Sequence, residues 1–107
     1  MFKALVVAFN AVSAGQTSPT YGDSAYKLND LRRTEVLIEV IALPVGDADP
    51  STVVFTLQPQ QSLDGQIWYP IDDPITTAGL STFYVMTPYF NLVLSPVQNG
   101  AVTVRLA

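Results

Sequence analysis

Apolar and polar residues alternate with a period of two along much of this chain. In residues 34–43, one face of the pattern carries Val36, Ile38 and Val40, and the other carries Glu35, Leu37, Glu39 and Ile41. This period is typical of a β-strand with one face in the core. The segment is therefore predicted to be a strand whose outward face still holds two large apolar residues, Leu37 and Ile41.

Residues 52–58, 80–86, 89–95 and 101–106 are predicted to be further strands. Val53, Phe55 and Leu57 share one face, and in the last strand Val102, Val104 and Leu106 point inward while Thr103 and Arg105 point outward. The sequence "PVQNGA" ends in an Asn-Gly pair and predicts a tight hairpin link before that last strand.

The N-terminal segment, residues 4–13, is apolar and rich in valine. We interpret it as a first strand that is buried on both faces or lies in an interface. A signal peptide is disfavoured because Asn10 interrupts the short apolar run. About seven strands at intervals of roughly ten residues, with little helix, predict an antiparallel β-sandwich of jelly-roll or immunoglobulin-like type.

Residues 1–107 suit a single domain, in which residues 14–33 stand out as polar. A helical turn beginning at Asp23 is one interpretation of this segment, but an extended arm or long loop fits its few apolar residues better. We expect such an arm to contact a neighbouring subunit. Its aromatic and basic side chains are therefore interface candidates, namely Tyr21, Tyr26, Arg32 and Arg33.

The stretch "SLDGQIWYP", residues 62–70, joins an Asp-Gly pair to the single tryptophan of the chain. Asp-Gly between two strand-like segments predicts a two-residue turn with positive φ at Gly65. That register pairs Gln61 with Trp68 and places Trp68 on the face of Phe55 and Leu57, as a core anchor. The alternative is a sugar site in which Trp68, Tyr69 and Tyr89 form a stacking platform.

The second half of the chain resembles small β-sandwich proteins of tailed-phage virions, a group that includes capsid decoration (cement) proteins. The resemblance is carried by "VVFTLQPQQSLDGQIWYPI" and "TPYFNLVLSPVQNGAVTVRLA". Ser62, Asp64, Gly65 and Trp68 match the S-x-D-G-x-x-W hairpin of such chains. Asn91 departs from the pattern, because an arginine often follows the aromatic pair there. The resemblance implies a structural virion protein located at the capsid surface.

Composition changes this picture in one respect. Only 13% of residues are charged and 49% are hydrophobic, which favours a surface that is partly covered by a partner. The net charge is −4 with no basic stripe, so nucleic-acid binding is not expected. The chain holds neither histidine nor cysteine, so we expect no enzyme and no cofactor. No stretch is long enough to be expected to span a membrane.

The acidic residues offer weak candidates for chemistry. Asp47 with Asp49, and Asp72 with Asp73, could donate oxygen ligands to calcium, but we interpret them as turn caps and expect no metal site. Glu35 and Glu39 lie four residues apart on one strand face, roughly 13 Å by strand rise. That separation is too large for paired acid–base catalysis.

These observations lead to one expected function. The chain is expected to be a capsid decoration protein that stabilises a phage head by binding between capsid subunits. Its partner would be the major capsid protein or another virion protein, and a homo-oligomer, with a trimer favoured, is expected. The alternatives are a carbohydrate-binding module and a tail or fibre adaptor domain. The N-terminal strand and the face that carries Leu37 and Ile41 are expected to form the contacts.

Overall fold

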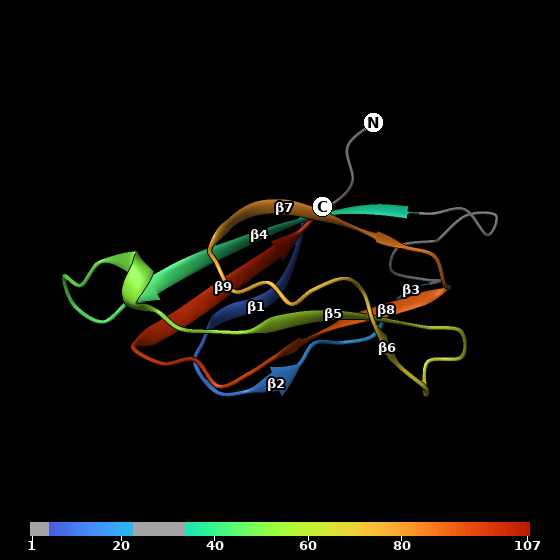
Figure 1. Ribbon diagram of the computed structural model, residues 1–107, viewed down its shortest axis with the longest axis horizontal. Helices are drawn as coiled ribbons and strands as arrows, with labels where there is room; N and C mark the ends of the chain where they lie inside the picture. The colour runs from blue at the N-terminus through green and yellow to red at the C-terminus, as the bar shows by residue number, and fades with distance from the viewer. Residues whose placement is uncertain (1–4, 23–33) are drawn as a thin grey trace.

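The regular secondary structure of the described residues is β-strand apart from one short 3-10 helix, as the period-two pattern predicted. A computed structural model describes residues 5–22 and 34–107 of the chain (Figure 1). The strands are β1 (Val6–Val12), β2 (Gln16–Thr17), β3 (Tyr21–Gly22), β4 (Thr34–Pro44), β5 (Leu57–Ser62), β6 (Tyr69–Pro70), β7 (Gly79–Val85), β8 (Tyr89–Leu94) and β9 (Gly100–Leu106). A short 3-10 helix, η1 (Pro50–Thr52), follows β4.

The strands form two antiparallel sheets that pack face to face. The first sheet has the order β1-β9-β4-β7, and the second has the order β2-β8-β5-β6, with β3 also paired to β8. The predicted antiparallel β-sandwich is therefore confirmed.

The pairing of the strands distinguishes between the two sandwich types that the sequence left open. Because β2 and β3 both pair with β8, they act as one interrupted strand, and the described residues then form eight strands. In that count the first strand pairs with the eighth, the second with the seventh, the third with the sixth and the fourth with the fifth. This folding of one long double-stranded ribbon onto itself is the jelly-roll arrangement.

The core lies between the sheets and is made of the inward residues of the long strands. The first sheet contributes Val36, Ile38, Val40, Phe83, Val85, Val102, Val104, Leu106 and Phe9, and the second contributes Leu57, Phe90, Leu92 and Leu94. Phe90 is central, because its ring meets those of Tyr21 and Phe83 at centroid distances of 5.2 and 5.8 Å. The inward faces predicted for the strands at 34–43 and 101–106 are confirmed.

Three local predictions are wrong. β1 is an edge strand in which only Phe9 is buried, so it is not buried on both faces, whereas the alternative, that it lies in an interface, stays a prediction. Residues 52–58 do not form one strand, because η1 takes the start of the segment and β5 begins at Leu57. The Asn-Gly pair does not close a hairpin, since β8 and β9 belong to different sheets and the chain crosses between them at this point.

Gly100, at that crossing, is constrained by a close approach of the backbone. Its φ is 157°, and a Cβ at this position would lie 2.2 Å from the carbonyl oxygen of Leu43. Only glycine lets β9 begin directly beside the end of β4.

Candidate functional site

The outer face of the four-stranded sheet carries an apolar surface that the described residues leave uncovered. On β4 the outward side chains include Leu37 and Ile41, and on β7 they include Leu80 and Tyr84. The register sets Leu37 beside Thr82, and Glu39 beside Leu80. Leu80 is 72% exposed and Leu37 is 42% exposed. Large aliphatic side chains are thus collected on a face that the sandwich itself does not need.

The apolar surface continues onto β9 and the start of the chain. Leu5 and Val7 are both more than half exposed, and Val7 pairs with Arg105 of β9. Leu5, Leu37, Leu80 and Ala107 line a hollow of about 160 Å³ in this face, together with Glu39, Arg105 and Leu106. We call this surface, defined by Leu5, Val7, Leu37, Leu80 and Tyr84, the outer apolar face.

The charged groups on the outer apolar face are engaged with neighbours on the same face. Arg105 forms a salt bridge with Glu39, and its Nε donates to Glu39 Oε1 at 2.6 Å. The hydroxyl of Tyr84 donates to Glu35 Oε2 at 2.9 Å. A partner that covers this face would bury charges that already have a partner, which costs far less than burying a lone charge.

The outer face of the other sheet has a different chemistry. Its central strands β5 and β8 direct Gln58, Gln60 and Val93, all half-buried, away from the core, and Asn91, which pairs with Gln60, is buried on the same side. Amide side chains therefore dominate there. The contrast between the two faces makes the outer apolar face the stronger candidate for an apolar contact.

The hairpin around Ser62 and Asp64 is held by a dense set of hydrogen bonds. Ser62, which is 0% exposed, accepts at Oγ from the backbone N–H groups of Asp64 (3.3 Å) and Gly65 (2.8 Å). The same hydroxyl donates to Asp64 Oδ1 at 3.0 Å. Asp64 Oδ1 also accepts from the N–H groups of Gln66 (2.8 Å) and Ile67 (3.0 Å). Both side chains of the motif thus act as turn-forming groups.

The electrostatics of this turn follow from those bonds. The backbone N–H of Ile67, then that of Gln66 and then the hydroxyl of Ser62, lower the pKa of the Asp64 carboxyl from its usual value. The bonds favour the ionised form because they all donate to the carboxylate. Gly65 has a φ of 81°, which confirms the positive φ predicted at this position.

The predicted register of the hairpin is wrong. Gln61 pairs with Tyr69 rather than with Trp68, so the turn is a loop over residues 63–68 and not a two-residue turn. The extra residues are held by Asp64 Oδ1, which takes the place of cross-strand bonds. As a result Trp68 is half-buried and lies outside the core cluster, so the prediction of a core anchor is also wrong. Tyr89 is half-buried too, and Tyr69 is 61% exposed.

Of the four interface candidates in the polar segment, the structure describes only Tyr21. Tyr21 is a core residue, 6% exposed and packed on Phe90, so its prediction as an interface residue is wrong. Burial raises the pKa of its phenol. Tyr26, Arg32 and Arg33 lie outside the described residues.

The start of that segment belongs to the sandwich itself. β2 and β3 pair with β8, and Ser18 between them exchanges hydrogen bonds with the backbone of Leu92. Residues 14–22 are therefore not an arm, and the rest of the segment, residues 23–33, lies outside the described residues.

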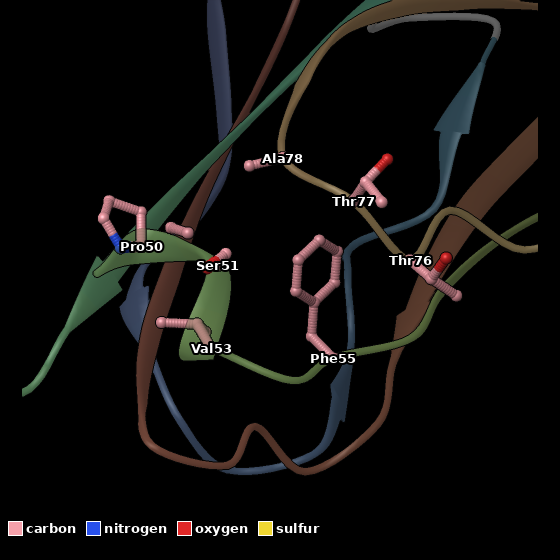
Figure 2. A pocket seen from close by; sticks show the side chains of 8 residues that line it. Pro50, Ser51, Val53, Phe55, Thr76, Thr77 and Ala78 are labelled. Atoms are coloured by element: carbon pink, nitrogen blue, oxygen red, sulfur yellow. The ribbon is translucent and has the colours of Figure 1, made fainter. Parts of the chain in front are cut away.

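A cavity of about 330 Å³ opens at the end of the sandwich near η1. Figure 2 shows the ring of Phe55 pointing into it, between Ser51 and Val53 of the η1 segment on one side and Thr76, Thr77 and Ala78 on the other. The residues that line it include hydroxyls and apolar groups but no carboxylate, amine or guanidinium. The lining of the cavity therefore offers no general acid or base.

Among the aspartates that were candidates for a calcium site, Asp49 has defined hydrogen bonds, and these stabilise the local backbone. Asp49 caps η1, because its Oδ1 accepts from the N–H of Ser51 at 2.8 Å. This bond lowers the pKa of the Asp49 carboxyl. Within residues 5–22 and 34–107, no three acidic side chains gather in a group that could hold a metal ion. In the same ranges no helix has the length and apolarity needed to cross a membrane.

Sequence reasoning found only part of the outer apolar face. It placed Leu37 and Ile41 on the outward side of their strand, where the structure has them, and it named the N-terminal strand, which holds Leu5 and Val7, but it did not include Leu80 or Tyr84. The alternation of Leu80, Thr82 and Tyr84 with Ser81, Phe83 and Val85 was a signal for β7. Its position beside β4 was not available from the sequence.

Comparison with protein-family models, with curated proteins and with solved structures finds no match for this chain.

Proposed function

We propose that this chain is a structural protein of a phage virion, most directly a capsid decoration protein that binds between capsid subunits. The observation that carries the proposal is the outer apolar face, a set of exposed Leu, Val and Tyr side chains on one sheet of a jelly-roll domain. Contiguous exposed apolar surface on a small domain is typical of protein–protein contacts. The resemblance of the second half of the chain to virion accessory proteins supports the same direction.

The proposed mechanism is stabilisation by burial at many equivalent positions. Each copy removes apolar area from water at about 25 cal/mol per Å², and association entropy offsets a large part of that gain. Repetition over a capsid lattice makes the sum of these contacts large. The jelly roll supplies a rigid platform, and because jelly rolls occur in capsid proteins and in lectins alike, the fold by itself does not select between these functions.

The test is binding to purified capsids of the encoding phage that lack this protein, measured by cosedimentation. Leu37→Asp should abolish binding, because it places a charge in the middle of the outer apolar face between Glu35 and Glu39. Thr17→Asp is the matched control, since it adds the same charge to an exposed position of the other sheet. It should bind as the parent does.

The ionic strength of the binding assay gives a second readout. Apolar contacts persist in molar salt and in EDTA, whereas exposed ionic or metal-bridged contacts are weakened. Replacing Arg32 and Arg33 together should weaken binding less than Leu37→Asp. If salt or EDTA releases the protein while Leu37→Asp binds normally, the outer apolar face is not the contact and the proposal fails.

A carbohydrate-binding module is the second candidate, and the exposure of the hairpin favours it. Tyr69 is exposed and Trp68 and Tyr89 are half-buried, so aromatic rings are accessible near one end of the sandwich. Aromatic rings of this kind stack on sugar faces. Binding of the chain to a glycan array, lost in Tyr69→Ala and Trp68→Ala but kept in Leu37→Asp, would favour this function over the first.

A further inference from the structure

Asn99 and Gly100 form the one asparagine–glycine pair of the chain, at the point where β9 begins beside the end of β4. Asparagine before glycine is the dipeptide most prone to deamidation, because glycine has no side chain to hinder attack by its own backbone nitrogen. Asn99 is exposed, so water can reach its amide. A chemically reactive pair therefore lies on the surface, at the junction of two long strands of the first sheet.

The backbone at this junction accounts for both residues of the pair. Asn99 has a φ of 66°, a left-handed conformation that asparagine adopts more readily than most residues with a side chain. A side chain at Gly100 would meet the carbonyl oxygen of Leu43. The fold thus favours a labile sequence here for reasons of backbone geometry.

The deamidation reaction joins the backbone nitrogen of Gly100 to the side-chain carbon Cγ of Asn99. The Cγ–Nδ2 bond breaks, and the side-chain nitrogen leaves as ammonia with the proton of the Gly100 N–H. Water then opens the resulting succinimide at one of its two carbonyl groups, which gives aspartate or isoaspartate. Water is the only co-reactant, and no oxidant or reductant is needed.

The folded conformation of Asn99 opposes this ring closure. For a residue with a side chain, a φ of 66° is allowed with a ψ of about 30–60°. In that range the Gly100 nitrogen and the Asn99 Cβ lie on opposite sides of the Cα–C bond, whereas the five-membered ring requires them on the same side. The backbone must therefore rotate away from its folded conformation before the nitrogen can attack.

Two hydrogen bonds resist that rotation. Asn99 Nδ2 donates to the carbonyl oxygen of Thr52 at 3.0 Å, which holds the side-chain amide against η1. The carbonyl oxygen of Asn99 belongs to the same peptide group as the Gly100 nitrogen, and it accepts from the N–H of Val45 at 3.3 Å. The reaction therefore requires η1, the end of β4 and the start of β9 to separate locally.

We propose that Asn99 is a deamidation site that the fold protects, and that its modification makes an opening of this junction permanent. Aspartate at this position has no N–H to donate to Thr52 and sets a negative charge beside that carbonyl oxygen. Isoaspartate adds a backbone carbon before Gly100, which displaces Gly100 from its close approach to Leu43. Either product prevents the junction from forming again as before. This proposal concerns the chain alone and does not rest on the virion function.

The protection is tested on the full chain, incubated in buffer and in guanidinium chloride at the same pH and temperature, with deamidation measured by peptide mapping. Asn99 should react at least about tenfold more slowly in buffer, because only the locally open state reacts. Asn10, which is exposed and precedes Ala11, is the internal control and should react much later than Asn99 in the denaturant. Equal rates at Asn99 with and without denaturant would overturn the proposal.

The contribution of η1 is tested with Asp49→Ala and its matched control Asp47→Ala. Asp49 Oδ1 caps η1 by accepting from the N–H of Ser51, so its loss should loosen Thr52 and raise the rate in buffer by roughly fivefold, a usual effect of losing a helix cap. Asp47 is exposed, and its carboxylate has no hydrogen bond within the described part of the chain, so the control should react as the parent does. An unchanged rate in Asp49→Ala would contradict the assigned role of η1.

The permanence of the opening has its own measurement. Molecules deamidated at Asn99 in guanidinium chloride should, after the denaturant is removed, unfold at a lower Tm than unmodified molecules separated from the same sample. Because both fractions share one history, the difference reports the modification alone. An equal Tm for the two fractions would overturn the inference that the modified junction cannot form again.

Discussion

Removing the hydroxyl of Ser62 should destabilise the whole domain, although the residue lies beside a surface loop. Ser62 is 0% exposed, and its Oγ accepts from the N–H groups of Asp64 and Gly65 and donates to Asp64 Oδ1. Ser62→Ala leaves the shape of the site nearly unchanged but removes all three bonds. A buried group that loses its partner costs about 1–3 kcal/mol, and the short bond to Gly65 at 2.8 Å is the one least easily replaced.

The loss of all three hydrogen bonds should not lower the free energy of unfolding by three times the value for one bond, because the loop that contains Asp64 is exposed to water. Asp64 is exposed and water can replace the hydroxyl at its carboxylate. The loss is therefore set mainly by the N–H of Gly65, and we expect about 2 kcal/mol, or roughly 10 °C in Tm for a domain of this size. Ser13→Ala is the matched control, because Ser13 is exposed and no hydrogen bond of its hydroxyl is found in the described residues.

The assay is urea unfolding followed by tryptophan fluorescence, with thermal unfolding as a second measure. Trp68 lies within the loop segment and reports on it directly. A change in the midpoint at constant slope would show a loss of stability rather than a change in the unfolded state. If Ser62→Ala is as stable as Ser13→Ala, the hydrogen bonds of the hairpin are not structural, and the S-x-D-G-x-x-W motif needs another explanation.

Three further predictions follow from the same structure. Trp68→Ala should lower the free energy of unfolding clearly less than Phe90→Ala, for which a loss of about 3–5 kcal/mol is expected, because only Phe90 is fully buried. Equal losses in urea unfolding would contradict the position of Trp68. Gly100→Ala should destabilise the domain more than Gly46→Ala. Both glycines have positive φ, but only at Gly100 would the added Cβ meet a backbone oxygen. Equal Tm values for the two variants would contradict this. The pKa of Asp64 is lower in the folded state than in the unfolded chain, so its carboxylate contributes fully to the free energy of unfolding above about pH 4. This contribution is lost as the pH falls through the lowered pKa. The difference in the free energy of unfolding between the parent and Asp64→Asn should therefore shrink between pH 7 and pH 3 in denaturant titrations.

The sequence by itself determined the fold class and the inward face of the long strands. Val36, Ile38 and Val40 in β4, and Val102, Val104 and Leu106 in β9, were assigned correctly because side chains alternate strictly along a strand. The positive φ of Gly65 was also predicted correctly, since it depends on local turn chemistry. These features arise within a few residues, and a single sequence contains that information.

The hairpin shows where local reasoning failed. Asp-Gly predicted a two-residue turn, but Asp64 Oδ1 binds the N–H groups of Gln66 and Ile67 and holds a longer loop. This side-chain-to-backbone bonding shifted the register, so that Gln61 pairs with Tyr69 and Trp68 leaves the core. The same residues are compatible with a two-residue turn and with the longer loop over residues 63–68. The difference in free energy between them depends on side-chain hydrogen bonds that the alternation of apolar and polar residues does not reveal.

Only the tertiary structure decided which strands are neighbours. Long-range pairing placed β7 at an edge beside β4, so that Leu80 joined Leu37 on one outer surface, and it placed β8 and β9 in different sheets despite the Asn-Gly pair between them. It also turned Tyr21 inward against Phe90. Such contacts join residues far apart in the chain, and their order depends on how all the apolar faces are buried together, which no local period specifies.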